Sequence, residues 1–255
     1  MSRKFFLRNI VALLVLNAWG MACFAKDPFT KVTFSGEKSL RISADLYTAS
    51  SGKKAPIIIL FHQAHSSRGE YRSIAPRLLR MGFNCLAVDT RAGGKDRWNG
   101  VENETTEDAL KKKMPDNYDA AYHEMEAALK WVKDNKFTGK IILWGSSFSA
   151  SLAFRLAEEH SKEISVLLAF SPGEYFEGRP QVVASWAGRL KNIPTFVSCG
   201  SGEKSRTKPI YDAISGNNKT FYLPEKGEHA SSILMEDPGK NWKPVEQFLG
   251  RFKES

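Results

Sequence analysis

Short apolar runs alternate with segments of helical periodicity along most of this chain. Residues 29–34 and 40–46 alternate apolar and polar side chains, which predicts a hairpin of two strands. Six later runs are apolar without alternation, as in strands that are buried on both faces. These runs are residues 56–61, 85–88, 141–143, 166–170, 195–199 and 221–223.

Helical segments lie between these runs. Apolar residues recur at spacings of three and four over residues 118–132, and again around Leu152 and Leu156. Repeated alternation of strand and helix predicts an α/β fold: a doubly wound, mostly parallel sheet of eight strands with helices on both faces. Residues 91–116 are polar and contain glycines, so we expect a loop or a small excursion there.

The first 25 residues have the layout of a secretory signal peptide. Three basic residues precede an uncharged stretch of 17 residues, 9–25, which small residues close. We expect cleavage after Ala25, a single domain over residues 26–255, and a periplasmic or secreted location. A membrane span is the rival interpretation, but this stretch is at the short edge of what crosses a bilayer. Lipidation at Cys23 is a third and weaker interpretation, because a lipidated cysteine usually has a leucine three residues before it and this chain has Gly20 there.

Charge argues against a nucleic-acid partner. Removing residues 1–25 lowers the formal charge from +9 to +6, because that stretch holds three basic residues and no acidic one. The lysines are scattered, and the only tight cluster, residues 111–113, is flanked by acidic residues. A nucleic-acid binder would show a basic stripe interleaved with aromatic residues. The charge therefore predicts a solvated basic surface.

Two cysteines remain after residue 25, Cys85 and Cys199. Export would permit a disulfide between them. Each cysteine, however, lies in a mostly apolar run. We therefore expect two buried free thiols, which behave as small hydrophobic side chains.

The candidate chemistry begins where a buried strand meets a helix of small residues, at residues 141–151. The sequence around Ser147 has the form Gly-x-Ser-x-Ser in the strand-to-helix context of a nucleophile elbow. Gly145 permits the tight turn, Ser147 is the candidate nucleophile, and the backbone N–H of Phe148 is a candidate oxyanion donor. Ser149 replaces the usual second glycine. An ordinary helix-capping serine is the alternative interpretation of this turn.

A serine nucleophile needs a base, and only two of the five histidines follow Ser147 in the chain. His160 lies in the helix after the elbow. His229 lies in a loop after the last predicted strand, where a mobile imidazole can reach the turn. The order serine, acid, histidine that is typical of such elbows therefore selects His229 as the base.

The chain resembles the α/β-hydrolase superfamily, in particular its dienelactone-hydrolase-like branch, from about residue 56 to residue 252. The resemblance rests on residues 60–71, 87–94 and 171–176, on the elbow and on the loop of His229. It implies a hydrolase of small carboxylic esters or lactones that forms an acyl-enzyme on Ser147 and needs no metal or organic cofactor. It also implies that Gln63 supplies a second oxyanion N–H and that His62 shapes the same loop.

The triad acid is open between two glutamates. Glu203 is the only carboxylate in residues 200–205, where the acid is expected, and Glu174 follows the preceding strand. We favour Glu203, with Glu174 as the alternative and a Ser–His dyad as a third possibility. Asp89 and Arg91 are interpreted as a structural pair.

Two other functional classes fit the sequence less well. A non-catalytic hydrolase-fold protein that binds a ligand is suggested by Gly202, where an acid might be expected, and by Ser149. A small serine peptidase ranks lower, because neither a propeller nor a large cap precedes the hydrolase segment. A metal site at His62 and His65 has little support, since the neighbouring sequence adds no further ligands.

Overall fold

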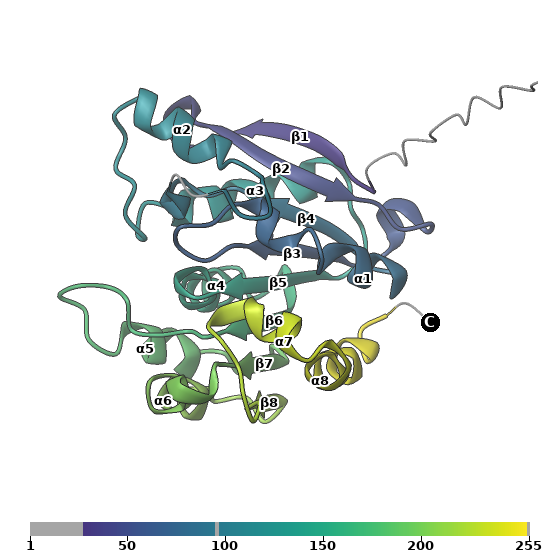
Figure 1. The fold of residues 1–255 in the computed structure, drawn as a ribbon, viewed down its shortest axis with the longest axis vertical. Helices are drawn as coiled ribbons and strands as arrows, with labels where there is room; N and C mark the ends of the chain where they lie inside the picture. Colours follow the sequence, from purple (N-terminus) through teal and green to yellow (C-terminus); the bar gives the residue numbers. More distant parts are fainter. Residues whose placement is uncertain (1–27, 95–96, 254–255) are drawn as a thin grey trace, which may run out of the picture.

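Eight strands form one sheet in the computed structural model, which describes residues 28–94 and 97–253 (Figure 1). The order across the sheet is β1-β2-β4-β3-β5-β6-β7-β8. Strands β1 and β2 are antiparallel to each other and β2 is antiparallel to β4, whereas all later neighbours are parallel. The strands are β1 (Thr30–Ser35), β2 (Arg41–Tyr47), β3 (Ile57–Phe61), β4 (Asn84–Val88), β5 (Ile141–Ser146), β6 (Ile164–Phe170), β7 (Thr195–Ser198) and β8 (Lys219–Tyr222). The predicted mostly parallel sheet of eight strands is confirmed.

Helices cover both faces of this sheet, as predicted (Figure 1). The helices are α1 (Ala75–Arg80), α2 (Glu104–Lys111), α3 (Tyr122–Asp134), α4 (Phe148–Glu159), α5 (Val182–Gly188), α6 (Lys204–Ala213), α7 (Ile233–Glu236) and α8 (Pro238–Gly250). None of these described helices is long and apolar enough to cross a membrane. The predicted signal peptide, residues 1–25, lies outside the described residues.

Strand β3 shows why its sequence is continuously apolar. Ile57, Ile59 and Phe61 belong to the cluster that packs against α3 and α4. Ile58 and Leu60 belong to the opposite cluster, which includes residues of α1 and α8. All five side chains are fully buried, and each contributes about 1.5–3 kcal/mol relative to an exposed position.

The segment 91–116 contains the short helix α2, so of the expected loop or small excursion the structure has an excursion that includes a helix. Asn103 caps this helix, because its side-chain oxygen accepts a hydrogen bond from the N–H of Thr106 at 2.8 Å. The Oγ1 atom of Thr105 accepts from the N–H of Ser43 in β2 at 3.0 Å. The helix is therefore anchored to the antiparallel part of the sheet through polar contacts rather than an apolar stripe.

The ion pairs after β4 also differ from expectation. Asp89 does not pair with Arg91; it accepts from Arg68 Nη1 at 2.5 Å and from the Arg68 N–H at 2.7 Å. Arg91 instead contacts Glu124 of α3, with Nη2 at 2.8 Å from Oε1. Each buried charge thus has a partner from a different segment, which ties the loop to its neighbours on both sides.

Cys85 and Cys199 are buried free thiols, as predicted. Cys85 lies in β4 and Cys199 directly follows β7, and three strands separate these two in the sheet. Four steps of about 4.8 Å exceed the Cα separation of about 7 Å that a disulfide can span.

The carboxyl ends of β3, β5, β6, β7 and β8 meet at one edge of the sheet because these strands are parallel. Five segments that carry candidate site residues begin at that edge. In open α/β sheets this edge is where ligands bind. The topology thus brings together residues that lie far apart in the sequence.

Candidate active site

Ser147 occupies a strained turn between β5 and α4. Its φ and ψ angles are 59° and −122°, a region that side-chain-bearing residues seldom adopt. Its N–H donates to the carbonyl of Phe170 in β6 at 2.8 Å, and its own carbonyl accepts from the N–H of Ser151 at 3.2 Å. Strand and helix together hold the turn, which has the geometry of a nucleophile elbow.

The residues on either side of the turn fit this close approach. A Cβ atom at Gly145 would lie 2.5 Å from the Cα of Ala150 and 2.6 Å from the carbonyl oxygen of Ser149, so only glycine fits there. Ser149 is buried, and its Oγ donates to the carbonyl of His62 at 2.6 Å. The serine in place of the second glycine therefore joins α4 to the loop after β3.

His229 lies beside the serine hydroxyl. Its Nε2 is 2.7 Å from Ser147 Oγ, and its Nδ1 is 2.7 Å from Glu203 Oε1. With the ring proton on Nδ1, the imidazole donates to the carboxylate and accepts from the serine. The structure thus brings Ser147, His229 and Glu203 into one chain of hydrogen bonds.

Glu203 follows β7 in the 3-10 turn Ser201–Glu203. Its Oε2 accepts from Ser171 Oγ at 2.6 Å and from the N–H of Gly200 at 3.1 Å. Arg206 Nη2 lies 3.1 Å from Oε1. Burial raises the pKa of this carboxyl, but the hydrogen bonds from His229 and Ser171 outweigh burial and leave the pKa below its ordinary value. Glu203 is therefore ionised at neutral pH.

Ser171 was not singled out by the sequence analysis, although it belongs to a segment that carries the family resemblance. It directly follows β6 and has a φ of 53°. Its Oγ donates to Glu203 and accepts from the N–H of Ala230 at 2.8 Å. Ser171 therefore links the loop of the acid to the loop of the base. A serine immediately after a buried strand was the only signal in the sequence.

Glu174, the alternative acid, is placed elsewhere. Its Oε2 and Oε1 accept from the N–H groups of Val183 and Ala184, both at 2.9 Å. These N–H groups lie in the first turn of α5, where they lack partners within the helix. Glu174 therefore stabilises the start of a helix, and the structure pairs His229 with Glu203 instead.

The expected oxyanion donor Gln63 requires a correction. Its N–H donates to Glu70 Oε2 at 2.9 Å, so it is not available to a substrate oxygen. The N–H of Phe148, the other expected donor, begins α4 and lacks a partner within the helix. The N–H of Ala64, one residue after Gln63, has no hydrogen-bond partner among the described residues. The sequence could not reveal the shift, because it depends on a carboxylate seven residues away.

His62 orients the peptide that contains the Ala64 N–H. Burial lowers the pKa of His62 to about 4, so its ring is neutral at neutral pH. Its Nε2 accepts from the N–H of Thr90 at 2.9 Å, which leaves the proton on Nδ1, 2.7 Å from the carbonyl of Gln63. The carbonyl and N–H of a trans peptide point in opposite directions. His62 therefore turns the Ala64 N–H away from its own ring.

Both ring nitrogens of His62 form hydrogen bonds with the backbone. Neither nitrogen is therefore available as a ligand for the metal site considered for His62 and His65. A second group, Glu126, Glu159 and His160, has ligand atoms within 4.8 Å of one another. Glu159 already accepts from Tyr122 at 2.5 Å and from Arg155 at 2.8 Å. This group lies at the opposite end of α4 from Ser147, about 18 Å along the helix.

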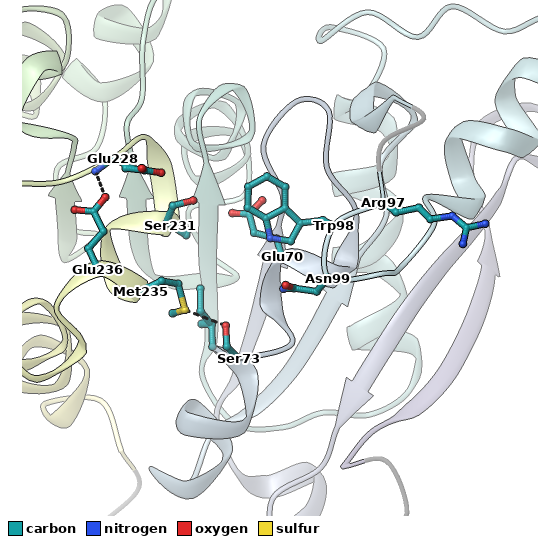
Figure 2. Close-up of a pocket in the computed structure, with 11 residues that line it drawn as sticks. Glu70, Ser73, Arg97, Trp98, Asn99, Glu228, Ser231, Met235 and Glu236 are labelled. Carbon is teal, nitrogen blue, oxygen red and sulfur yellow. Dashed lines mark hydrogen bonds between the residues drawn. The ribbon is translucent and has the colours of Figure 1, made fainter.

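A cavity of about 440 Å³ opens between the 3-10 turn Arg68–Tyr71 and the segment after His229. Figure 2 shows Glu70 and Ser231 among its lining, with Trp98, Met235, Glu228 and Glu236. Glu70 is almost fully buried, and burial raises its pKa to about 7 against the hydrogen bonds that favour its ionised form. Glu70 therefore places a carboxyl with a raised pKa beside the elbow. Its Oε1 accepts from the Oγ of Ser146, the residue before Ser147, at 2.5 Å.

Comparisons with known proteins agree with the fold. Residues 56–204 match a family model described as alpha/beta hydrolase fold. An esterase of Pyrococcus furiosus is similar in structure, with 22% identity, a TM-score of 0.67, and coverage of 88% of this chain and 92% of the esterase. A dienelactone hydrolase from Anabaena variabilis has 15% identity, a TM-score of 0.67, and coverage of 89% and 100%. A carboxyl esterase from Bacillus coagulans has 12% identity, a TM-score of 0.68, and coverage of 88% and 98%. Among curated proteins, none matches this sequence.

Proposed function

This chain belongs to the α/β-hydrolase fold family, and we propose that it is a serine hydrolase that cleaves small carboxylic esters or lactones through an acyl-enzyme on Ser147. The observation that carries the proposal is the continuous chain from Ser147 Oγ through His229 to Glu203, with both separations at 2.7 Å. A serine hydroxyl is a weak nucleophile unless a base removes its proton and an acid orients that base.

In the acylation step, Ser147 Oγ attacks the carbonyl carbon of the ester while its proton passes to His229 Nε2. Glu203 accepts the Nδ1–H and stabilises the imidazolium that forms. The tetrahedral intermediate then collapses: the bond to the alcohol oxygen breaks, and His229 returns the proton to that oxygen. An acyl-Ser147 ester and the free alcohol result.

Deacylation repeats these roles with water. His229 removes a proton from water as the water oxygen attacks the acyl carbon. When the second intermediate collapses, the bond to Ser147 Oγ breaks and the serine regains its proton from His229. The protein side chains supply nucleophile, base and orienting acid, so this mechanism requires no cofactor.

The developing negative charge on the substrate oxygen needs two N–H donors. We assign the first to Phe148, at the start of α4, where the helix dipole also favours negative charge. We assign the second to Ala64 in place of Gln63. This assignment is supported by the engaged N–H of Gln63 and by the peptide orientation that His62 imposes.

The residues that suggested a non-catalytic binding protein, Gly202 and Ser149, are both compatible with a hydrolase. Glu203 supplies the carboxylate next to Gly202. Its side chain is longer than that of an aspartate, and its Oε1 lies within hydrogen-bond distance of His229. Ser149 fits the elbow and makes a buried hydrogen bond there. Neither residue therefore favours a binding module over a hydrolase.

Turnover of a short p-nitrophenyl ester tests the proposal. We expect Ser147→Ala to abolish turnover while the melting temperature stays within a few degrees of that of the wild type, because the substitution removes a single oxygen atom and keeps the Cβ atom. Turnover retained by Ser147→Ala would reject the elbow assignment. A wild-type protein that never turns over esters but binds one would favour the binding module.

We also propose that the protein is exported and loses its first 25 residues, on the strength of the basic start and the apolar stretch that follows. The mature chain recovered from the exported fraction should begin at Lys26. An intact Met1, or a lipid on Cys23, would overturn this assignment.

A further inference from the structure

Glu70 is a buried carboxyl that contacts two of the segments used by the proposed mechanism and is linked to a third. Its Oε2 accepts from the N–H of Gln63 at 2.9 Å and from Ser66 Oγ at 3.2 Å, both in the loop after β3. Its Oε1 accepts from Ser146 Oγ at 2.5 Å, at the end of β5 and directly before the elbow. Ser146 Oγ in turn accepts from the N–H of Ser231 at 3.1 Å, two residues after His229.

From these contacts we propose that Glu70 is a positioning residue for ester hydrolysis, which holds the oxyanion donor of Ala64 and the elbow of Ser147 in their reactive arrangement. The inference rests on the proposed function. Glu70 itself does not touch the reacting atoms; it acts through Gln63 and Ser146.

The hydrogen bonds behind the elbow run in one direction. Trp144 Nε1 can only donate, and it donates to Ser231 Oγ at 2.9 Å. Ser231 Oγ then donates to Ser146 Oγ, 2.9 Å away, and Ser146 donates to Glu70. Each hydroxyl has one proton, so this order requires an acceptor at the end of the chain. The Oε1 oxygen of Glu70 is that acceptor.

The peptide of the oxyanion donor is fixed from both sides of Gln63. Glu70 holds the N–H of Gln63, and His62 Nδ1 holds its carbonyl. With both groups held, the peptide between Gln63 and Ala64 has a single orientation, and the Ala64 N–H is preorganised. Preorganised donors account for much of the rate enhancement in acyl transfer, and small displacements of such groups cost a large part of it.

A neutral amide at position 70 would change the direction of the serine chain. The oxygen of Glu70→Gln can still accept from the N–H of Gln63. Its NH₂ group, however, must donate to Ser146, which then has to donate to Ser231 in the reverse direction. Alanine at this position removes both links. Glutamine at position 70 therefore disrupts part of this network, and alanine disrupts more of it.

The experiment measures kcat and KM for a short p-nitrophenyl ester, with kcat expressed per active site titrated by a fluorophosphonate. We expect Glu70→Ala to lower kcat by about 10- to 100-fold and KM to change less than about threefold, because the lost interaction acts in the transition state. Glu70→Gln should lie between the alanine variant and the wild type. Ser146→Ala cuts the links from Glu70 to the elbow and to Ser231 but keeps the bond from Gln63, so it should lower kcat by about three- to tenfold.

The matched control is Glu246→Gln, since this partly exposed carboxylate of α8 pairs with Arg77 of α1 at 2.7 Å. Its kcat per titrated site should equal that of the wild type. A purely structural role for Glu70 would reduce the titrated fraction but leave kcat per site unchanged, and this result would overturn the inference. If Glu70→Ala does not fold, wild-type kcat values in both Glu70→Gln and Ser146→Ala would overturn it. A wild type that neither labels nor turns over would instead overturn the proposed function.

Discussion

The hydroxyl of Ser149 donates a hydrogen bond to the backbone carbonyl of His62, at 2.6 Å. Both residues are fully buried, and the bond joins the first turn of α4 to the loop that carries the proposed oxyanion donor. The residue that departs from the usual elbow pattern is thus a link between the nucleophile and the oxyanion peptide.

Removing this link should cost both stability and rate. Ser149→Ala leaves the carbonyl of His62 buried without that partner, a loss of about 1–2 kcal/mol in the free energy of unfolding. We expect a lower midpoint in urea denaturation with an unchanged slope, and a kcat reduced by up to about tenfold. The exposed Ser205→Ala serves as control and should match the wild type. An unchanged midpoint in Ser149→Ala would show that the bond contributes nothing.

The two candidate acids should separate cleanly by kinetics. Glu203→Gln should lower kcat by about 10²- to 10⁴-fold with little change in KM, because the carboxylate stabilises the imidazolium of His229 only as it forms. Glu174→Gln should cost less than about tenfold in kcat and mainly lower the melting temperature, since Glu174 caps α5. The reverse ranking would contradict the assignment. Wild-type rates in both variants would indicate a Ser–His dyad.

Stability should depend on pH through Glu70. Burial raises its pKa from 4.5 to about 7, so between these values the folded protein keeps a proton that the unfolded chain releases. The free energy of unfolding therefore falls as pH rises through this window, by about 3 kcal/mol in total from this group. Glu70→Gln does not titrate.

Urea denaturation of the wild type and Glu70→Gln at pH 4.5 and pH 8 measures this contribution. The stability of the wild type relative to the variant should decrease by about 3 kcal/mol from the lower to the higher pH. Parallel pH profiles would mean that the pKa of Glu70 is not raised.

Thiol titration tests the strand order. The chain from Lys26 onward should show two reactive thiols in denaturant without reductant and essentially none in the native state, because Cys85 and Cys199 are buried. Burial also raises the pKa of both thiols, which slows their reaction further. A gain of two hydrogens in the mass of the monomer on reduction would contradict the separation of β4 from β7.

All eight strands could be predicted from the sequence: β1 and β2 from alternating apolar and polar side chains, and the later strands from continuous apolar runs such as residues 57–61, which are fully buried in β3. Helix α2 could not. Its stability comes from the Asn103 cap and from the bond of Thr105 to β2, and neither produces an apolar period.

The candidate site shows the same division. The Gly-x-Ser-x-Ser turn indicated Ser147 and chain order indicated His229, whereas the acid stayed open between Glu203 and Glu174. The partners of buried polar groups were not predictable, because they come from segments distant in sequence. Gln63 was expected to be a free donor but is held by Glu70, and Asp89 pairs with Arg68 instead of Arg91.

The central claim is that Ser147 is an activated nucleophile, and covalent labelling tests it most directly. A fluorophosphonate reacts with a serine whose proton is removed by a base and leaves resting serines unmodified. Mass spectrometry of the digested protein should place one adduct on Ser147 in the wild type, and Ser147→Ala should carry none. An adduct on another residue, or an unlabelled wild type that is folded, would contradict the account.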